Sequence, residues 1–550
     1  MRHPFHTVIT MSATIRNYAV EPGLPKKTES ICPECGKILE ASIFEENGKV
    51  LMQKECPQHG LFRDVYWSDV GLYLKAEKYA HDGIGLTNPA DSKLKEGENA
   101  NFIIDGKRID MLSSTGLANV DLTNRCNMNC PICFAVANQA GYVYEPDFAT
   151  IVKMLETLRT EAPIRCTAVQ FSGGEPTIYP MFLEAIAKAK ELNFAQVQVA
   201  TNGIKFAKDY EFLKKASQAG MNTIYLSFDG VSDDVYLQAR DRRMFQIKLD
   251  VIANCKRLRE DIGKSPSIVL VPTVVKGMND HQIGAIVDFA LEHADVVRGI
   301  NFQPVAFTGR IEREELEAGR FTLPDLAREM GEQTGYTDMD DWYPVPVVAP
   351  ISNFASIILD ENKVTFTAHP HCGIATYLFV GDDGKVTPFP RFVDLDRFST
   401  GMAELAEKAE KARFKKFTAI KIIKLMNSCI IDEKLPEGLD KKKFIMIMKD
   451  IMSNKSKKTL AKFSWKMMLI SGMHFQDAHN YDVERVKRCC IHYVTPDCEV
   501  IPFCAYNGGP EYRKAVESRH SVPLDEWKAA NKKEALELEQ ALIVPEDQKA

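Results

Sequence analysis

Between residues 118 and 305, short runs of β-branched and apolar residues alternate with longer runs in which apolar residues recur every three or four positions. The short runs predict six strands, over 119–123, 168–172, 196–201, 223–227, 268–275 and 299–304. The longer runs predict helices between them, for example over 148–159, 181–192, 210–219, 244–259 and 282–293. Six βα units in a row predict a parallel sheet that curls into an open partial barrel. In barrels the chemistry lies at the C-terminal ends of the strands.

The loop after the first predicted strand carries three closely spaced cysteines, Cys126, Cys130 and Cys133, with Phe134 directly behind them. A [4Fe–4S] cluster is normally held by four cysteine thiolates, so three of them leave one iron open to a substrate or cofactor. A zinc knuckle is the alternative, but it requires a fourth ligand close by. Because neither His nor Cys follows before Cys166, the spacing favours a cluster with an open iron.

The next three strands also end in short polar motifs: SGGEPT at 172–177, TNG at 201–203 and SFDG at 227–230. Each motif alone is weak, since Gly and Asn are ordinary turn residues. In this order behind the three-cysteine loop they are specific for a ligand site. The candidate binding residues are Gly173, Gly174, Glu175, Asn202, Ser227 and Asp229. A structural turn is an equal alternative for Asn202.

Three arginines, Arg240, Arg242 and Arg243, lie just beyond the fourth strand. One of them can meet a ligand carboxylate, whereas solvated surface charge is the favoured interpretation for at least two.

Two matching knuckles precede the barrel. CPECG and CPQHG place Cys32, Cys35, Cys56 and His59 at the spacing C-x2-C-x20-C-x2-H, and each knuckle ends in a glycine. This pattern predicts a closed tetrahedral Cys3His site that holds one iron or zinc ion, as in rubredoxins and zinc ribbons. Backbone N–H groups that point at the thiolates would tune such a site.

A further set of cysteines follows the barrel. Cys372 lies in HPHCG, where His369 and His371 are runner-up ligands, and Cys429 ends a helical run. The block at 486–507 adds Cys489, Cys490, Cys498 and Cys504. We expect Cys372, Cys429, Cys489 and Cys504 to hold an auxiliary [4Fe–4S] cluster. Cys490 and Cys498 could join them, form part of a second cluster, or simply be buried.

These segments divide the chain into a core and its flanks. The expected fold class is α/β: a partial (β/α)6 barrel with an N-terminal rubredoxin-like knuckle domain and a C-terminal α+β auxiliary-cluster domain. The predicted divisions are an arm at 1–30, the knuckle domain at 31–67, a connector at 68–117, the core at 118–305, a linker at 306–350, the auxiliary and substrate domain at 351–510 and a helical tail at 511–550.

Composition narrows the classes of function. A net charge of −6 over 550 residues leaves no overall nucleic-acid signature. No apolar run reaches the length of a membrane span, and the N-terminus has no pattern of a signal peptide. Twelve of the fourteen cysteines fall in groups, with Cys166 and Cys255 apart, and this grouping indicates metal sites in a reducing cytoplasm rather than disulfides.

One segment differs from the rest of the chain in its charge and composition. Residues 401–470 hold 17 Lys and Arg against 8 Asp and Glu, interleaved with Ile, Met and Phe. Two interpretations explain this stretch about equally well: a helical subdomain with its own Met-rich core, and an adaptable surface for lipids in peripheral contact with a membrane.

The three-cysteine loop and the ordered strand-end motifs resemble the signature of the radical S-adenosylmethionine (SAM) superfamily. The resemblance implies a cluster at Cys126, Cys130 and Cys133 whose open iron binds SAM, with Phe134 beside it. It further implies that Gly173, Gly174 and Glu175 bind the SAM amino group and that Ser227 and Asp229 contact its ribose or carboxylate. The cofactor would then supply a 5′-deoxyadenosyl radical, with electrons from a donor such as ferredoxin.

With the knuckle pair, HPHCG and the C-terminal block, the chain more narrowly resembles archaeal radical SAM proteins identified as tetraether lipid synthases. That family was also linked to methylation of a dihydropterin. The leading hypothesis is therefore hydrogen abstraction from phytanyl chains and their coupling into tetraether lipids. The alternatives are a radical SAM methyltransferase that acts on a small-molecule dihydropterin, and a non-catalytic iron–sulfur electron carrier. A compact polar cavity would favour the pterin, and a long apolar tunnel the lipid.

Overall fold

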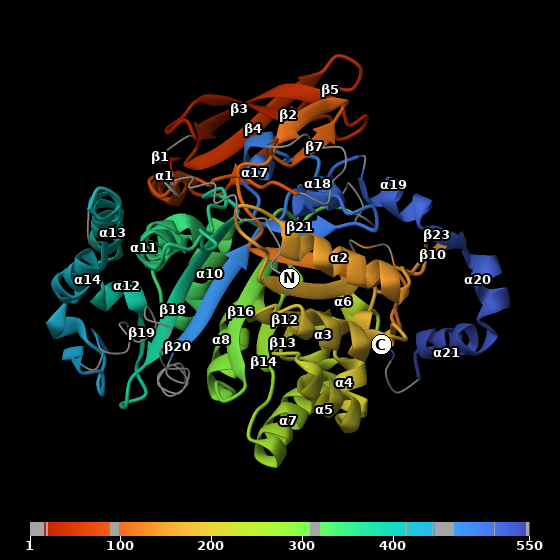
Figure 1. The fold of residues 1–550 in the computed structure, drawn as a ribbon. Coiled ribbons are helices and arrows are strands. Elements are labelled where there is room, and N and C mark those ends of the chain that lie inside the picture. The colour runs from red at the N-terminus through yellow and green to blue at the C-terminus, as the bar shows by residue number, and fades with distance from the viewer. Residues whose placement is uncertain are drawn as a thin grey trace, which may run out of the picture.

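The computed structural model describes most of the chain, and Figure 1 shows its arrangement. The described residues are 16–17, 20–88, 98–133, 135, 137–308, 319–412, 415–442, 444–445, 467–510, 512–545 and 549. Among them, no helix is both long enough and apolar enough to cross a bilayer.

The six strands predicted for the core are present, and all are parallel. They are β9 (Leu117–Thr123), β11 (Ala168–Gly173), β12 (Gln196–Thr201), β13 (Thr223–Ser227), β14 (Ser267–Val271) with the short β15 (Thr273–Val274), and β16 (Val297–Pro304). The helices of the core are α2 (Phe148–Thr160), α3 (Phe182–Glu191), α4 (Ile204–Lys208), α5 (Tyr210–Ala219), α6 (Asp233–Arg240), α7 (Phe245–Ile262) and α8 (Ile283–Glu292). Their apolar faces pack on the sheet and form one large core with it. The predicted fold class is thereby confirmed for the barrel.

Strands from the C-terminal region extend this sheet at both edges. Beyond β16 lies β20 (Met467–Met473), which is parallel to it, followed by the antiparallel β18 (Gly373–Val380). Beyond β9 lies the parallel β21 (Ile491–Val494), which forms a hairpin with β22 (Val500–Pro502). The short β17 (Tyr343–Pro344) and β19 (Val386–Pro388) both pair with β18. The region that follows the barrel in sequence therefore completes the walls of the barrel.

The knuckle domain is a four-stranded antiparallel sheet that caps one end of the molecule (Figure 1). It consists of β2 (Lys26–Ile31), β3 (Ile38–Glu46), β4 (Lys49–Cys56) and β5 (Gly60–Trp67), and α1 (Val70–Glu77) follows. Two small pairs complete this end: β1 (Arg16–Asn17) with β6 (His81–Asp82), and β7 (Asn101–Ile104) with β8 (Lys107–Asp110).

The basic helical region forms a second apolar core. Its elements are α11 (Ala349–Leu359), α12 (Phe389–Phe392), α13 (Leu395–Glu410) and α14 (Lys415–Cys429). Phe392, Met402 and Met426 are among the buried side chains of this cluster, which is distinct from the core of the barrel. The interpretation as a helical subdomain with its own core therefore accounts for Met402 and Met426, whereas Met468 of β20 belongs to the core of the barrel.

The remaining helices join these parts. They are α10 (Leu323–Thr334), α17 (Val483–Lys487), α18 (Phe503–Gly508), α19 (Tyr512–Arg519), α20 (Leu524–Ala530) and α21 (Lys532–Leu542). In the tail, β23 (Ser521–Pro523) pairs with β10 (Tyr142–Tyr144), which follows the cluster loop. Trp527 of α20 packs with Val143, and its ring lies 4.6 Å from the guanidinium carbon of Arg125. The tail thus supports the residue that precedes Cys126.

Candidate active site

A large cavity of about 1220 Å³ lies along the inner face of the sheet. At one end it is lined by Cys126, Cys130 and Cys133, next to the carboxyl ends of the core strands. At the other end it is lined by residues at the starts of strands, such as Thr167 and Ala195. The cavity therefore runs the length of the strands, and a substrate inside it can reach the cluster loop.

The cluster loop is held by a side chain that the sequence pattern did not mark. The Asn138 side chain accepts a hydrogen bond from the Cys126 backbone N–H (3.0 Å). Its amide group donates to the carbonyl oxygens of Cys126 (2.7 Å) and Met128 (3.0 Å). Asn138 itself has a positive φ of 65°, a conformation that Asn tolerates better than most residues. A turn-forming Asn shortly after the third cysteine is the only sequence signal for this role.

The three cysteines fit an iron–sulfur cluster rather than one metal ion. Four thiolates around a single ion with 2.3 Å bonds lie about 4 Å apart. Among the described residues, the only group of three or more ligand atoms within 4.8 Å of one another belongs to the knuckle domain. Burial raises the pKa of the Cys126 and Cys130 thiols, so their thiolates require a positive partner, which cluster iron would provide. Phe134 lies outside the described residues.

Gly173 and Gly174 line the cavity, but the chain itself makes glycine necessary there. A Cβ atom on Gly173, whose φ is +124°, would lie 2.1 Å from the Thr123 carbonyl oxygen. A Cβ atom on Gly174 would lie 2.2 Å from the Arg125 carbonyl oxygen. The end of β11 therefore packs directly on the start of the cluster loop, which only glycine permits.

Glu175 lines the cavity and is fully buried. Its carboxylate accepts hydrogen bonds from the Thr177 hydroxyl (2.6 Å), the Thr201 hydroxyl (2.7 Å) and the Asn202 backbone N–H (2.8 Å). Burial raises its pKa, and these hydrogen bonds act in the opposite direction. Glu175 thus ties the ends of β11 and β12 together beside the cluster loop. Its predicted contact with the SAM amino group stays a prediction.

Asn202 and Lys248 lie at the same end of the cavity. The Asn202 side chain donates to Asn127 in the cluster loop (2.7 Å) and caps the backbone N–H of Ile204 (3.0 Å), so the turn interpretation describes its contacts. Lys248 was not marked by the sequence. Its buried amine donates to the Asn202 carbonyl oxygen (2.6 Å), and burial lowers its pKa to about 8. This amine can meet a carboxylate at the SAM end of the cavity.

Asp229 does not line the cavity, whereas Ser227 does. The Asp229 carboxylate forms a two-pronged ion pair with Arg240, with N–O distances of 2.7 and 2.8 Å. Arg240 lines the cavity and also interacts with the Cys130 thiol. Asp229 therefore orients an arginine beside the cluster loop. Of the other two arginines, Arg242 is buried outside this cavity, and Arg243 is about half exposed near Asp233.

The middle of the cavity is polar along the sheet. Amide groups form a hydrogen-bonded chain from Gln196 through Gln198 and Gln170 to Asn119, which in turn donates to the His492 carbonyl oxygen. These side chains point inward from β12, β11 and β9. This part of the cavity wall therefore presents both hydrogen-bond donors and acceptors to a substrate.

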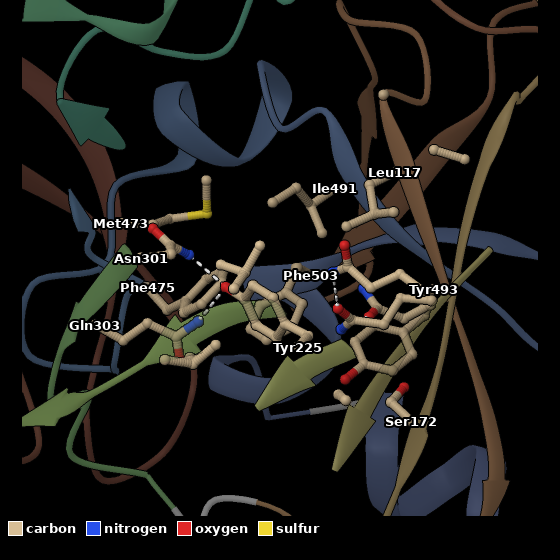
Figure 2. A pocket seen from close by; sticks show the side chains of 18 of the residues that line it. Leu117, Ser172, Tyr225, Asn301, Gln303, Met473, Phe475, Ile491, Tyr493 and Phe503 are labelled. Carbon is tan, nitrogen blue, oxygen red and sulfur yellow. Dashed lines mark hydrogen bonds between the residues drawn. The ribbon is translucent and has the colours of Figure 1, made fainter. Parts of the chain in front are cut away.

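A second polar group surrounds Tyr225 on β13 (Figure 2). The side-chain amides of Asn301 and Gln303 both donate to its phenol oxygen, the latter at 2.9 Å. Because that oxygen already accepts twice, the hydroxyl proton is free to be donated to a substrate. Facing these groups are the aromatic side chains of Phe475 and Phe503, whose stacked rings lie 3.9 Å apart, and Tyr493 (Figure 2).

The knuckle domain forms a compact metal site. The ligand atoms of Cys32, Cys35, Cys56 and His59 all lie within 4.8 Å of one another. The pKa of Cys56 is lowered to about 6, first by a hydrogen bond from the Gln58 backbone, which stabilises the thiolate that a metal requires. These residues therefore fit one tetrahedral ion.

The structure brings together only some of the C-terminal cysteines. The thiols of Cys372, Cys489, Cys490 and Cys504 lie close enough to influence one another. Cys429 is instead buried in the apolar core of the helical region, and its described polar neighbours are Ser428, Arg397 and Asp394. Cys498 lies at the turn between β21 and β22 with a φ of +66°. His371 stacks on Tyr73, and His369 accepts from the His371 backbone.

Comparison with known proteins agrees with this site. The family model of the radical SAM superfamily matches residues 120–290, and that of the HMPTM N-terminal zinc ribbon domain matches residues 24–68. The chain is 46% identical to 7,8-dihydro-6-hydroxymethylpterin dimethyltransferase of Methanocaldococcus jannaschii over 92% of its own length and 98% of that protein. It is 24% identical to a GTP 3′,8-cyclase of Clostridium acetobutylicum, over 40% of this chain and 64% of the cyclase. Streptococcus suis SuiB bound to SAM matches 40% of this chain and 47% of its own, at 19% identity and a TM-score of 0.30.

The radical SAM family model and the similarity to the Methanocaldococcus jannaschii protein define a radical SAM enzyme, and the cavity at the cluster loop agrees with this class. Within that superfamily, the chain belongs to the family of the Methanocaldococcus jannaschii dimethyltransferase. The expected [4Fe–4S] cluster, SAM and a mononuclear metal agree with the matched families and with the knuckle site. The alternative of a non-catalytic electron carrier is excluded by this membership.

The leading hypothesis of tetraether lipid coupling was wrong. The curated relative that spans nearly the whole chain is named for methylation of a pterin. The compositional support for a lipid also fails, because none of the described residues between Ala375 and Leu469 lines the cavity. In the described part of this region, apolar side chains such as Met402, Ile422 and Met426 pack in a core of their own, so its composition does not by itself support a lipid surface.

Proposed function

We propose that this enzyme transfers methyl groups to 7,8-dihydro-6-hydroxymethylpterin or a close dihydropterin. The similarity to a pterin dimethyltransferase over nearly the whole chain carries this proposal, together with the amides and aromatic rings along part of the cavity wall. The cavity itself runs the length of the strands and is not the compact polar pocket expected for a pterin. A pterin is a flat heteroaromatic ring system with hydrogen-bond donors and acceptors along its edge. Stacked aromatics such as Phe475 and Phe503 suit the faces of such a ring, and the amides around Tyr225 suit its edge.

Methylation replaces a C–H hydrogen of the substrate by a methyl group. When bound, the reduced cluster and SAM supply a 5′-deoxyadenosyl radical, which takes that hydrogen atom and leaves as 5′-deoxyadenosine. The substrate carbon would then take up a methyl cation equivalent from a methyl sulfonium donor, such as a second molecule of SAM that leaves as the thioether S-adenosylhomocysteine, together with one electron. Two electrons are thus consumed for each methyl group, and we propose a ferredoxin-type donor in a reducing cytoplasm as their source. The predicted membrane contact loses its rationale with the lipid hypothesis.

The residues of this chain would position the reactants and exclude water. Glu175, Asn202 and Lys248 support the SAM end of the cavity, and Arg240 braces Cys130. The amide and aromatic groups lie farther along the same space, so the substrate would be held in line with the cluster loop. Enclosure in a cavity limits side reactions of a radical with solvent.

Anaerobic incubation of the reconstituted enzyme with SAM, a reductant and the dihydropterin tests this function. We expect 5′-deoxyadenosine together with pterin products that carry one and then two additional methyl groups, detected by mass spectrometry. Cys130→Ala should abolish both products, whereas Cys255→Ala, at a buried cysteine of α7 away from the cavity, should keep them. Pterin that stays unmodified while SAM is cleaved at the no-substrate rate would refute the proposal.

A further inference from the structure

Arg485 of α17 is a buried cation without a carboxylate partner. It is 1% exposed, and its Nη2 donates to the His474 carbonyl oxygen (2.7 Å). Its Nε has no hydrogen-bond partner, and in the part of the chain that the structure describes no carboxylate forms an ion pair with it. Arg320, which is equally enclosed, pairs with both Asp477 and Asp64. Because an uncompensated buried charge is strongly destabilising, Arg485 requires an anion of another kind.

The groups near the Arg485 guanidinium are the Tyr66 ring, whose centre lies 5.6 Å from the guanidinium carbon, and the thiols of Cys372 and Cys504, which are close enough to interact with it electrostatically. Cys489 interacts in turn with Cys504 and Cys372. A guanidinium beside two thiols, with the third thiol close to both of them, favours their thiolate forms, which are the forms that hold a metal centre.

His474 lies beside the same thiols. In the antiparallel pair of β18 and β20, Gly373 is opposite Met473. One residue beyond each strand end, the His474 N–H donates a hydrogen bond to the Cys372 carbonyl oxygen (3.0 Å), so these two residues continue the pairing. Side chains directly opposite in such a ladder share one face, with Cβ atoms about 5 Å apart. The His474 ring is therefore a neighbour of the Cys372 thiol.

The His474 ring has unmet bonding capacity. The residue is 1% exposed, and neither ring nitrogen has a hydrogen-bond partner among the described residues. Buried polar atoms are nearly always paired, so two free nitrogens on one ring call for a partner such as a metal. A neutral imidazole is also the form that binds metals.

The thiols are too far apart for one ion. The described residues contain one group of three or more ligand atoms within 4.8 Å of one another, which is the knuckle site. A multinuclear centre fits the wider spacing around Cys372. The site also lies directly behind the cavity wall, because the Gln476 backbone N–H donates to the Cys504 sulfur (3.4 Å) and Gln476 and Phe503 line the cavity.

We propose that His474 is a ligand, together with Cys372, Cys489 and Cys504, of a second iron–sulfur cluster, and that Arg485 is the counter-charge of this cluster. The cluster can then exchange electrons with a substrate through the wall of Phe475 and Phe503. His474 takes the place that Cys429 was expected to fill. The assignment is independent of the substrate, so its test does not depend on methyl transfer.

Pulsed electron paramagnetic resonance of the reduced, reconstituted protein tests the ligand. Replacing Cys126, Cys130 and Cys133 together by alanine removes the signal of the SAM cluster and leaves that of the second cluster. We expect a strongly coupled nitrogen in this signal, which His474→Cys should eliminate while the iron content is kept. A signal without such a nitrogen in the parent protein, or one that survives His474→Cys, would overturn the assignment and point to Cys490 as the fourth ligand.

The reduction potential of the second cluster tests the counter-charge. Removing a positive charge next to an anionic cluster disfavours the added electron, so Arg485→Gln should weaken reduction at least tenfold, a fall of about 59 mV for one electron. Arg485→Lys should keep most of the potential. Arg488→Gln is the matched control, since Arg488 lies just after the same helix but pairs with Asp82 and Glu484.

If Arg485→Gln loses the cluster while Arg485→Lys retains it, the charge requirement is also supported. An unchanged potential in Arg485→Gln, loss of the cluster in both variants, or an equal shift in Arg488→Gln would overturn the role of Arg485.

Discussion

The knuckle domain and the C-terminal thiol site, which consists of Cys372, Cys489, Cys504 and His474, use the same residue types but assemble them differently along the chain. In the knuckle domain, Cys32 and Cys35 share one turn, Cys56 and His59 share another, and all four ligand atoms lie within 4.8 Å. In the C-terminal site, Cys372 directly precedes β18 and is separated by more than 100 residues from Cys489 and Cys504. The first site is a product of local chain geometry, whereas the second exists only when the sheet is complete.

The two sites are nevertheless joined. Thr28 and Tyr66 of the knuckle domain both donate to Asp482, at the start of the helix that carries Arg485 (2.7 Å each). Lys54 donates to the Ala478 carbonyl oxygen (2.6 Å) in the preceding loop. The knuckle sheet thus supports the segment between His474 and Arg485, which suggests why a small metal domain accompanies a barrel enzyme.

Loss of the knuckle metal should have the largest effect. Structural metal ions contribute about 10 kcal/mol or more to the folding of small domains. Cys56→Ser should therefore release the ion and expose β2–β5 to proteolysis, as measured by metal analysis and limited digestion. Cys255→Ser, at a cysteine outside any metal site, should retain the ion. Full metal content in Cys56→Ser would show that the site does not depend on this ligand.

Removing a thiol of the C-terminal thiol site should leave the knuckle domain intact. Cys504→Ala should lower the iron content by about four atoms per chain, the content of one [4Fe–4S] cluster, without release of the knuckle ion. Cys498→Ala is the control, because that residue lies at the hairpin turn of β21 and β22. Equal iron loss in both variants would mean that general unfolding, rather than a ligand, is responsible.

Breaking the buried ion pairs between the regions should have an intermediate effect. Arg320 pairs with Asp64 of the knuckle sheet and Asp477 of the C-terminal loop. Arg320→Gln leaves two buried carboxylates without their partner, so we expect a loss of about 3–5 kcal/mol in denaturant unfolding. Arg63→Gln, at a solvent-exposed pair with Glu46, should cause a much smaller loss of stability, because water screens exposed ion pairs. Similar losses in the two variants would contradict this assignment.

The smallest effect should appear as a dependence on pH. Burial lowers the pKa of Lys54 to about 8 from 10.5. Between these values the unfolded chain binds more protons than the folded one, so stability should rise with pH from about 8 to 10.5, by up to about 3 kcal/mol. Thermal unfolding of Lys54→Met should lack this rise, whereas Lys49→Met, at an exposed lysine of the same strand, should keep it. The same rise of stability with pH in both variants would refute the assignment of this effect to Lys54.

Much of the barrel could be predicted because its pattern is local. Each strand of the core buries alternate or continuous apolar residues and is followed by an amphipathic helix, so the period of the sequence reports the element. The predicted residues at the cluster end also meet in one place: Cys126, Gly173, Glu175 and Asn202 all line the cavity. Because the carboxyl ends of parallel strands lie at one edge of the sheet, the order of the motifs along the chain was enough to predict that these residues meet.

The roles of individual polar residues could not be predicted in this way. Asp229 pairs with Arg240, which the spacing did not predict, and its expected contact with SAM stays a prediction. Lys248 and Asn138 carried no recognisable motif. A carboxylate near a ligand site is equally suited to the ligand and to a neighbouring arginine. Only the three-dimensional arrangement determines which partner is close enough to satisfy the buried charge.

By itself, the sequence determined the six βα units, the three-cysteine loop, the strand-end motifs and the knuckle site, because all of these depend on spacing within a few residues or on one repeated unit. Only the tertiary structure decided that β20 and β21 complete the barrel, that Cys429 is separated from the other thiols, and that His474 and Arg485 lie beside Cys372. The physical reason is that contacts between distant segments depend on strand register and burial, which no local pattern encodes.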